Sequence, residues 1–149
     1  MTRAVAVRPI AAADTHPLRL CVLRDNLPTA VLVFDGDDEP TTFHLGAFRG
    51  DELVGIATFV DRPCSNTPDV MRSVQLRGMA VSPTLQSGGV GGVLLRTGIE
   101  RLRVDGVDVL WANARDTALG FYRGFGMTVG DAFVDVTTGI AHHRVWLHL

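Results

Sequence analysis

The chain has 149 residues, the length of a single domain, with 46% hydrophobic and 20% charged residues, a balance typical of a globular protein with a substantial core. Its formal net charge is −2 and it contains no basic run, so we expect no nucleic-acid partner, which would need positive charges along the phosphates. All fourteen basic residues are arginine, which excludes a Walker A lysine, a Schiff-base lysine and a lysine nucleophile.

The cysteines and the apolar segments indicate a reducing, aqueous environment. Cys21 and Cys64 lie far apart and have no metal-site spacing, so we expect two buried thiols and neither a disulfide nor a metal site. The start of the chain, Met1–Ile10, is interrupted by Arg3 and Arg8, and no apolar run approaches the roughly 18 to 20 residues of a membrane span. We therefore expect a cytoplasmic protein that binds no membrane.

Hydrophobic spacing predicts seven strands and three helices in chain order. The strands are expected over Ala4–Arg8 (ending at Pro9), Thr42–Phe48, Leu53–Val60, Met71–Val81, Val107–Ala112, Met127–Val136 and Ile140–Leu149. The helices are expected from Asp14 and Pro17 to about Asn26, over Val90–Val104, and over Ala118–Phe125 with Gly126 as its cap. Without an internal repeat or a linker, this order favours one α/β domain over residues 1–149, a mixed sheet with helices packed on its faces.

Three connecting segments carry turn signals. Arg49–Glu52 predicts a hairpin, and Thr137–Gly139 predicts the last turn. Asp35–Pro40 is acidic and rich in turn residues, so we expect a solvated surface loop, with a flank for a cationic substrate as the alternative.

The segment Val81–Leu95 passes from a strand end through four glycines directly into a helix. Such a junction offers unpaired backbone N–H groups and the positive end of a helix dipole, which together bind phosphate without a lysine. The alternative is a flexible loop before a helix. A dinucleotide-binding motif fits poorly, because Leu94 stands where its third glycine is required.

Two motifs in this part of the chain resemble a known family. Gln86–Gly91, with the sequence Gln-Ser-Gly-Gly-Val-Gly, resembles the acyl-CoA loop Arg/Gln-x-x-Gly-x-Gly/Ala of the GNAT superfamily of N-acetyltransferases and follows a strand that ends in Ala80–Pro83. Ala118–Met127 resembles that family's A-x-x-F-Y-x-x-x-G-F segment, with Met127 in place of phenylalanine. Further along, Trp111–Arg115, Phe133 and Gly139–His142 are similar to the ElaA-like branch.

The resemblance implies the GNAT fold, a central and mostly antiparallel sheet with helices on both faces, and acetyl-CoA as the cosubstrate without a metal. The acceptor would be a primary amine of a small molecule or peptide. Apart from the resemblance, a homodimer stays open as the assembly. The residues implied to bind the coenzyme are Met79, Ala80, Val81, Gln86, Ser87, Gly88, Gly89, Val90, Gly91, Gly92, Asn113 and Tyr122.

The resemblance also implies direct attack of the amine on the thioester, which calls for a base and an acid. Tyr122 matches the family's general acid, with an aromatic packed on the sheet as the alternative. The base is open, because Gln75 and Arg77 stand where many relatives carry glutamate. The candidates are a water chain and His142, which alternation directs away from His143; a structural strand histidine is the alternative for His142. An acyl-CoA-binding module without turnover is the alternative function.

Overall fold

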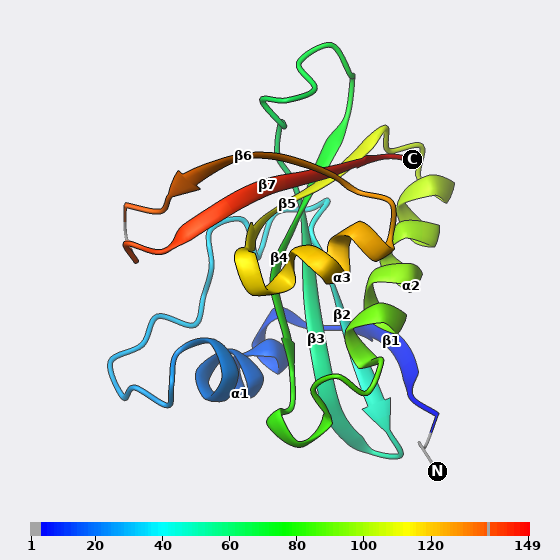
Figure 1. The fold of residues 1–149 in the computed structure, drawn as a ribbon. Helices are drawn as coiled ribbons and strands as arrows, with labels where there is room; N and C mark the ends of the chain where they lie inside the picture. Colours follow the sequence, from blue (N-terminus) through cyan, green and yellow to red (C-terminus); the bar gives the residue numbers. More distant parts are fainter. Residues whose placement is uncertain (1–3, 137) are drawn as a thin grey trace. The chain divides into compact units, whose positions relative to one another are not determined.

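The computed structural model describes residues 4–136 and 138–149, and these form two compact units (Figure 1). The first unit contains residues 4–60 and Leu76–Arg101, and the second contains Asp61–Gln75 and Leu102–Leu149. Mixed strands and helices make up both units, as the sequence predicts.

Four strands of the first unit follow one another in the order β1-β2-β3-β4. They span Ala6–Ile10 (β1), Phe43–Arg49 (β2), Glu52–Asp61 (β3) and Ser73–Val81 (β4). The first two pairings are antiparallel, and β2 and β3 form the predicted hairpin. Pro9 does not end β1, as we expected, but lies inside it, because β1 comes first in the strand order and a proline is tolerated on an edge strand.

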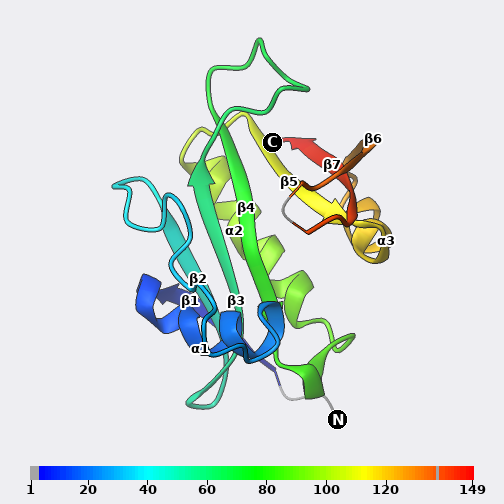
Figure 2. The same ribbon diagram turned by 90° about the vertical axis from the view of Figure 1, so that its left-hand side faces the viewer.

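The predicted central helix, α2, is confirmed at Val90–Val104. Two glycines allow it to pack closely on the first unit's strands. A Cβ atom on Gly98 would lie 2.2 Å from the ring of Phe59, which stacks on Phe43, and a Cβ atom on Gly55 of β3 would lie 2.8 Å from Val90. These side chains leave no room for a Cβ atom at either glycine, so α2 packs closely along one face of the first unit's strands. Figure 2 shows α1 on the opposite face.

The N-terminal helix is less regular than its sequence pattern predicts. It consists of a 3₁₀ turn at Ala12–Thr15 (η1), a short α segment at His16–Leu18 (α1) and a π turn at Arg19–Leu23 (η2). This winding directs Arg19 inward, where it is fully buried. The expectation of two buried thiols is wrong for Cys21, which is exposed, and confirmed for Cys64.

Arg19 forms the centre of a buried polar network. Its guanidinium donates to both carboxylate oxygens of Asp37, at 2.5 and 2.9 Å, and to the hydroxyl of Thr58. The same hydroxyl lies 2.7 Å from Nδ1 of His44, whose Nε2 lies 3.1 Å from the Asp37 carbonyl oxygen. Our prediction of a solvated loop at Asp35–Pro40 is therefore wrong at Asp37, which is only 5% exposed, because a charged partner 18 residues earlier draws it inward.

The second unit has the strand order β4-β5-β7-β6. The start of β4 pairs in parallel with β5 (Val109–Arg115), and β7 (Ala141–His148) lies antiparallel between β5 and β6 (Thr128–Val134). β5 begins two residues later than predicted and continues three residues further, because β7 supplies partners to its end. Thr137 of the predicted last turn lies outside the described residues.

A short helix follows β5. It begins as a 3₁₀ turn at Asp116–Ala118 (η4) and continues as α3, Leu119–Gly124. Gly126 has a φ of +80° and donates to the Arg123 carbonyl oxygen, which confirms it as the helix cap. No helix within residues 4–136 and 138–149 has the length and apolar character needed to cross a bilayer.

Candidate functional site

The glycine-rich loop of the first unit is braced by its own polar groups. A 3₁₀ turn, η3 (Pro83–Leu85), follows β4, and the Gly88 N–H donates to the Leu85 carbonyl oxygen at 3.1 Å. The side-chain amide of Gln86 donates back to the Val81 carbonyl oxygen at 3.2 Å. Gln86 therefore ties the loop to the end of its strand, and the N–H of Gly88, a predicted coenzyme contact, is already paired within the loop.

The backbone conformation explains the glycines of this loop. Ser87 and Gly89 have φ angles of +68° and +89°, a region that costs most residues energy. A Cβ atom on Gly88 would lie 3.0 Å from the Leu85 carbonyl oxygen. The Val93 N–H donates to Gly89, so the N–H groups of the three residues before Val93 lie ahead of the helix's own hydrogen bonds. This geometry suits a phosphate anion.

β4 leads into the loop through a backbone irregularity that the sequence analysis missed. Gly78 has a φ of +57° inside the strand, and a Cβ atom there would lie 3.2 Å from Phe34. The following residues, Met79, Ala80 and Val81, are the predicted backbone partners of the coenzyme. A lone glycine inside an apolar strand is the signal that could have indicated this irregularity.

One face of the second unit's strands carries two of the predicted site residues, Asn113 and His142. The pairing of β5 with β7 places Trp111 opposite Trp146, Asn113 opposite Arg144, and Arg115 opposite His142. Phe133 of β6 lies opposite His142 on the other side. Asn113 and His142 thus lie on one face, in adjacent rows, as alternation requires.

The two neighbouring histidines of β7 point in opposite directions, as predicted. The ring of His142 stacks on Phe133, with centroids 5.8 Å apart, and its Nδ1 donates to the Ile140 carbonyl oxygen at 2.9 Å. That bond leaves Nε2 as the acceptor nitrogen. His143 instead donates from Nδ1 to the Gly130 carbonyl oxygen at 2.8 Å, and its Nε2 lies 3.3 Å from an Asp116 carboxylate oxygen.

Tyr122 lies on α3 and is 8% exposed. Its ring packs edge-on against Phe121, with centroids 5.1 Å apart. No residue within the described ranges forms a hydrogen bond with its hydroxyl. Burial raises the pKa of the phenol to about 12, so the hydroxyl keeps its proton at every physiological pH.

A cavity of about 320 Å³ lies beside the loop that joins β3 to β4. It is lined by Asp61, Arg62, Pro63, Cys64, Thr67, Pro68, Val70, Met71, Arg72 and Ser73. None of the predicted site residues is among them. In the part of the chain that the structure describes, no three His, Cys, Asp or Glu side chains are grouped as a metal site.

Comparisons with known proteins agree with the motifs. Residues 11–127 match the family model described as the acetyltransferase (GNAT) family. The chain is 30% identical over 142 residues to YitI of Bacillus subtilis (strain 168), an uncharacterized N-acetyltransferase, and the match covers 93% of this chain and 92% of YitI.

Solved structures share the fold at low sequence identity. FeeM, an N-acyl amino acid synthase from uncultured soil microbes, has a TM-score of 0.82 and 13% identity, with 99% of this chain and 92% of FeeM covered. Escherichia coli ElaA has a TM-score of 0.75 and 18% identity, with 96% and 99% covered. Identities this low show the fold alone, so assignment to the ElaA-like branch stays a prediction.

Proposed function

Since the chain belongs to the acetyltransferase (GNAT) family, we propose that it transfers an acetyl group from acetyl-CoA to a primary amine of a small molecule or peptide. The observation that carries the proposal is the glycine loop at the start of α2, whose backbone N–H groups suit a pyrophosphate. We propose one functional domain over residues 1–149, because the family match extends through both units, and a cytoplasmic location.

The residues present fit the coenzyme. Bound acetyl-CoA would supply the acetyl thioester. The N–H groups around Gly89 to Gly92 would donate to its pyrophosphate, and the backbone of Met79 and Val81 would pair with its pantetheine arm as an added strand does. Asn113, exposed at the end of β5, would contact either the coenzyme arm or the acceptor.

The second unit's side chains would handle the protons. The acceptor must lose a proton as its nitrogen forms the new C–N bond and the C–S bond breaks, and Nε2 of His142 has the lone pair to accept it. Tyr122 would donate to the departing sulfur. Because its pKa is about 12, well above the thiol reference near 8.5, we expect the phenol to stabilise the developing thiolate mainly as a hydrogen-bond donor.

β4 lacks the glutamate that many family members carry, which leaves a second function as an alternative. Because the corresponding positions are a glutamine and an arginine, neither offers a carboxylate base. Gln75 is buried, and Arg77 donates to the Asp35 carbonyl oxygen at 2.7 Å. A module that binds acetyl-CoA without turning it over would satisfy the loop equally well.

The test measures binding and turnover in parallel. Acetyl-CoA should raise the Tm of the protein by mass action, because it binds the folded state alone. Release of free thiol should then rise with at least one amine in a broad panel of small amines and peptide N-termini. A Tm shift without turnover of any amine would favour the binding module, and no Tm shift would contradict both functions. Sedimentation of the same sample would tell a monomer from a homodimer.

A further inference from the structure

Arg144 projects from β7 into a mixed aromatic and polar environment. Its guanidinium lies 5.1 Å from the ring of Trp111 and 5.8 Å from that of Phe133. It donates from Nε to Oδ1 of Asn113 at 3.4 Å and from Nη1 to the hydroxyl of Ser65. The guanidinium is therefore held between two strands and the loop that joins β3 to β4.

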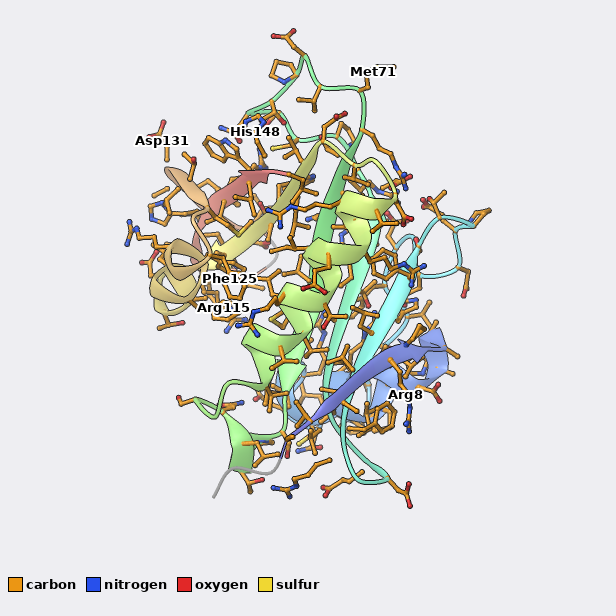
Figure 3. The ribbon with its side chains drawn as sticks, turned by 90° about the vertical axis from the view of Figure 1, so that its right-hand side faces the viewer. Arg8, Met71, Arg115, Phe125, Asp131 and His148 are labelled. Carbon is orange, nitrogen blue, oxygen red and sulfur yellow. The ribbon has the colours of Figure 1, made fainter. Side chains whose placement is uncertain are left out.

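These contacts leave Arg144 with unused donors. A guanidinium has five N–H groups, and the two hydrogen bonds account for two of them. No carboxylate among residues 4–136 and 138–149 forms an ion pair with Arg144. Asp131, an acidic residue of β6, is exposed, and Figure 3 shows it projecting away from the strand. A positive charge held against aromatic rings is thus open to an external anion.

Side chains of the loop that joins β3 to β4 close one side of this position. On the Trp111 side, Cys64 and Val70 of the loop pack against that ring together with Trp146, and the indole N–H donates to the Arg62 carbonyl oxygen at 2.9 Å. On the other side lies His142, two residues along the same strand face and thus about 7 Å away. An amine that contacts Arg144 would therefore lie on the same strand face as His142.

We propose that the acceptor amine also bears a carboxylate, and that Arg144 binds this carboxylate through its unused N–H groups. Planar guanidinium and carboxylate groups form paired, charge-assisted hydrogen bonds. Asn113 and Ser65 keep the guanidinium in place, and the rings of Trp111 and Phe133 lie beside it. This inference rests on the proposed function, because it uses His142 as the group that receives the proton of the same acceptor.

The test compares amines that differ only in the carboxylate. L-phenylalanine is paired with 2-phenylethylamine, and L-leucine with 3-methylbutylamine, as acceptors in the thiol-release assay. The wild-type protein should prefer the carboxylated member of each pair. Arg144→Gln should lower kcat/KM for that member by about 10- to 100-fold, mainly through KM, since the carboxylate is bound equally before and during the reaction. The amines without a carboxylate should be unaffected.

Two further variants sharpen the result. Arg144→Lys should recover only part of the loss, because an ammonium cannot form the paired contact. Arg123→Gln removes the same charge from an exposed position on α3 and should leave the preference intact. Because the Arg144→Gln substitution could disturb the strand, the Tm of each variant is measured with and without coenzyme A.

Several results would overturn the inference. One such result is a wild-type protein that does not prefer the carboxylated amines. Another is an Arg144→Gln variant whose kcat/KM falls equally for both amines of a pair. Either result would show that Arg144 does not bind a carboxylate of the acceptor. A weaker Tm shift with coenzyme A alone would assign Arg144 to the coenzyme instead. If no amine is acetylated, stabilisation of the coenzyme-bound protein by L-phenylalanine or L-leucine in wild type but not in Arg144→Gln would support the site, and its absence would contradict it. The proposed function itself fails separately, through the loss of coenzyme binding or turnover.

Discussion

His44 in the first unit and His142 in the second both lie on strands, but their hydrogen bonds differ. Both nitrogens of His44 lie within hydrogen-bonding distance of partners inside a buried network. His142 is half-buried and has one bonded nitrogen, while no described residue bonds to the other. The same residue type thus serves packing in one unit and is available for chemistry in the other.

The contrast extends to the other ionisable groups. Arg19 of the first unit is fully buried and paired with Asp37, whereas Arg144 of the second has unused donors. The first unit offers a ligand mainly backbone N–H groups, at the loop before α2. The proposed function assigns the binding of the coenzyme's phosphates to backbone N–H groups of the first unit and the proton transfers to side chains of the second.

The largest effect should come from breaking the first unit's buried ion pair. Arg19→Met leaves the Asp37 carboxylate buried without its cation, which costs about 3 to 5 kcal/mol of unfolding free energy. Urea denaturation measures this loss. Arg19→Met combined with Asp37→Leu should recover most of it, because an apolar pair replaces the ions. Arg49→Gln is the control: its pair with Glu52 is solvent-exposed, so the change should stay below about 1 kcal/mol.

The same ion pair predicts a pH dependence. Burial raises the pKa of Asp37, but hydrogen bonds from Arg19 and the Phe34 N–H, with the Arg19 charge, outweigh burial and lower it below the usual 3.8. A lowered folded-state pKa means that the stabilisation is present above pH 3.8 and is lost as the pH falls through the folded-state value. Asp37→Asn should remove this contribution to acid unfolding, and an acid-unfolding curve unchanged by that substitution would contradict it.

The third prediction concerns the glycine loop, the proposed phosphate site. Gly91 lies in the first turn of α2, so Gly91→Leu suits the helix and should leave the apo protein at least as stable. The side chain would block the close approach of a phosphate, so the Tm shift that acetyl-CoA produces should vanish. At a coenzyme concentration of about 100 Kd this is a loss of about 2.7 kcal/mol of stabilisation. Gly89→Leu should also lose the shift but destabilise the apo protein, because of its φ of +89°. Retention of wild-type affinity in both variants would show that the loop is not the phosphate site.

Tyr122→Phe tests whether a side chain of the second unit takes part in the chemistry. The substitution removes one hydroxyl that no described residue bonds, so the ring packing against Phe121 should survive. We expect coenzyme affinity to be unchanged and kcat to fall about 10²-fold or more, the scale for losing one hydrogen-bond donor to developing negative charge. Single-turnover measurement separates chemistry from product release. If the chemical step keeps its wild-type rate, Tyr122 is an aromatic of the core.

The sequence predicts the first unit's local elements better than its packing. The glycine loop and α2 depend on glycine spacing and on helical periodicity, both of which are local, and α2 has the predicted bounds. The pairing of Arg19 with Asp37 is not local, and it overrides the apolar pattern of the N-terminal helix. A buried ion pair of this kind is indistinguishable in sequence from two surface charges.

In the second unit the sequence predicts on which face of a strand a side chain lies, but not which distant residues it contacts. Alternation along the last strand places His142 and Arg144 on one face, and the strand pairing agrees. The contact between Arg144 and Ser65 joins residues 79 positions apart, and no periodicity indicates it. The end of β5 was also missed, because Asn113 and Arg115 are exposed polar residues whose strand conformation depends on pairing with β7.

The smallest and most specific effect is expected for the two histidines of β7. If Nε2 of His142 accepts the proton of the acceptor, kcat/KM should fall in acid, because a protonated imidazole has no lone pair left to accept that proton. His142→Gln should remove or shift this acidic limb. His143→Gln should leave it in place, because His143 points to the other face and contacts Gly130 and Asp116. Phe133 stacks on His142, so the substitution could also destabilise the fold. The Tm of both variants is therefore compared first, which separates unfolding from the loss of a catalytic base. An acidic limb that survives His142→Gln unchanged would assign the proton to a water chain or to the amine itself.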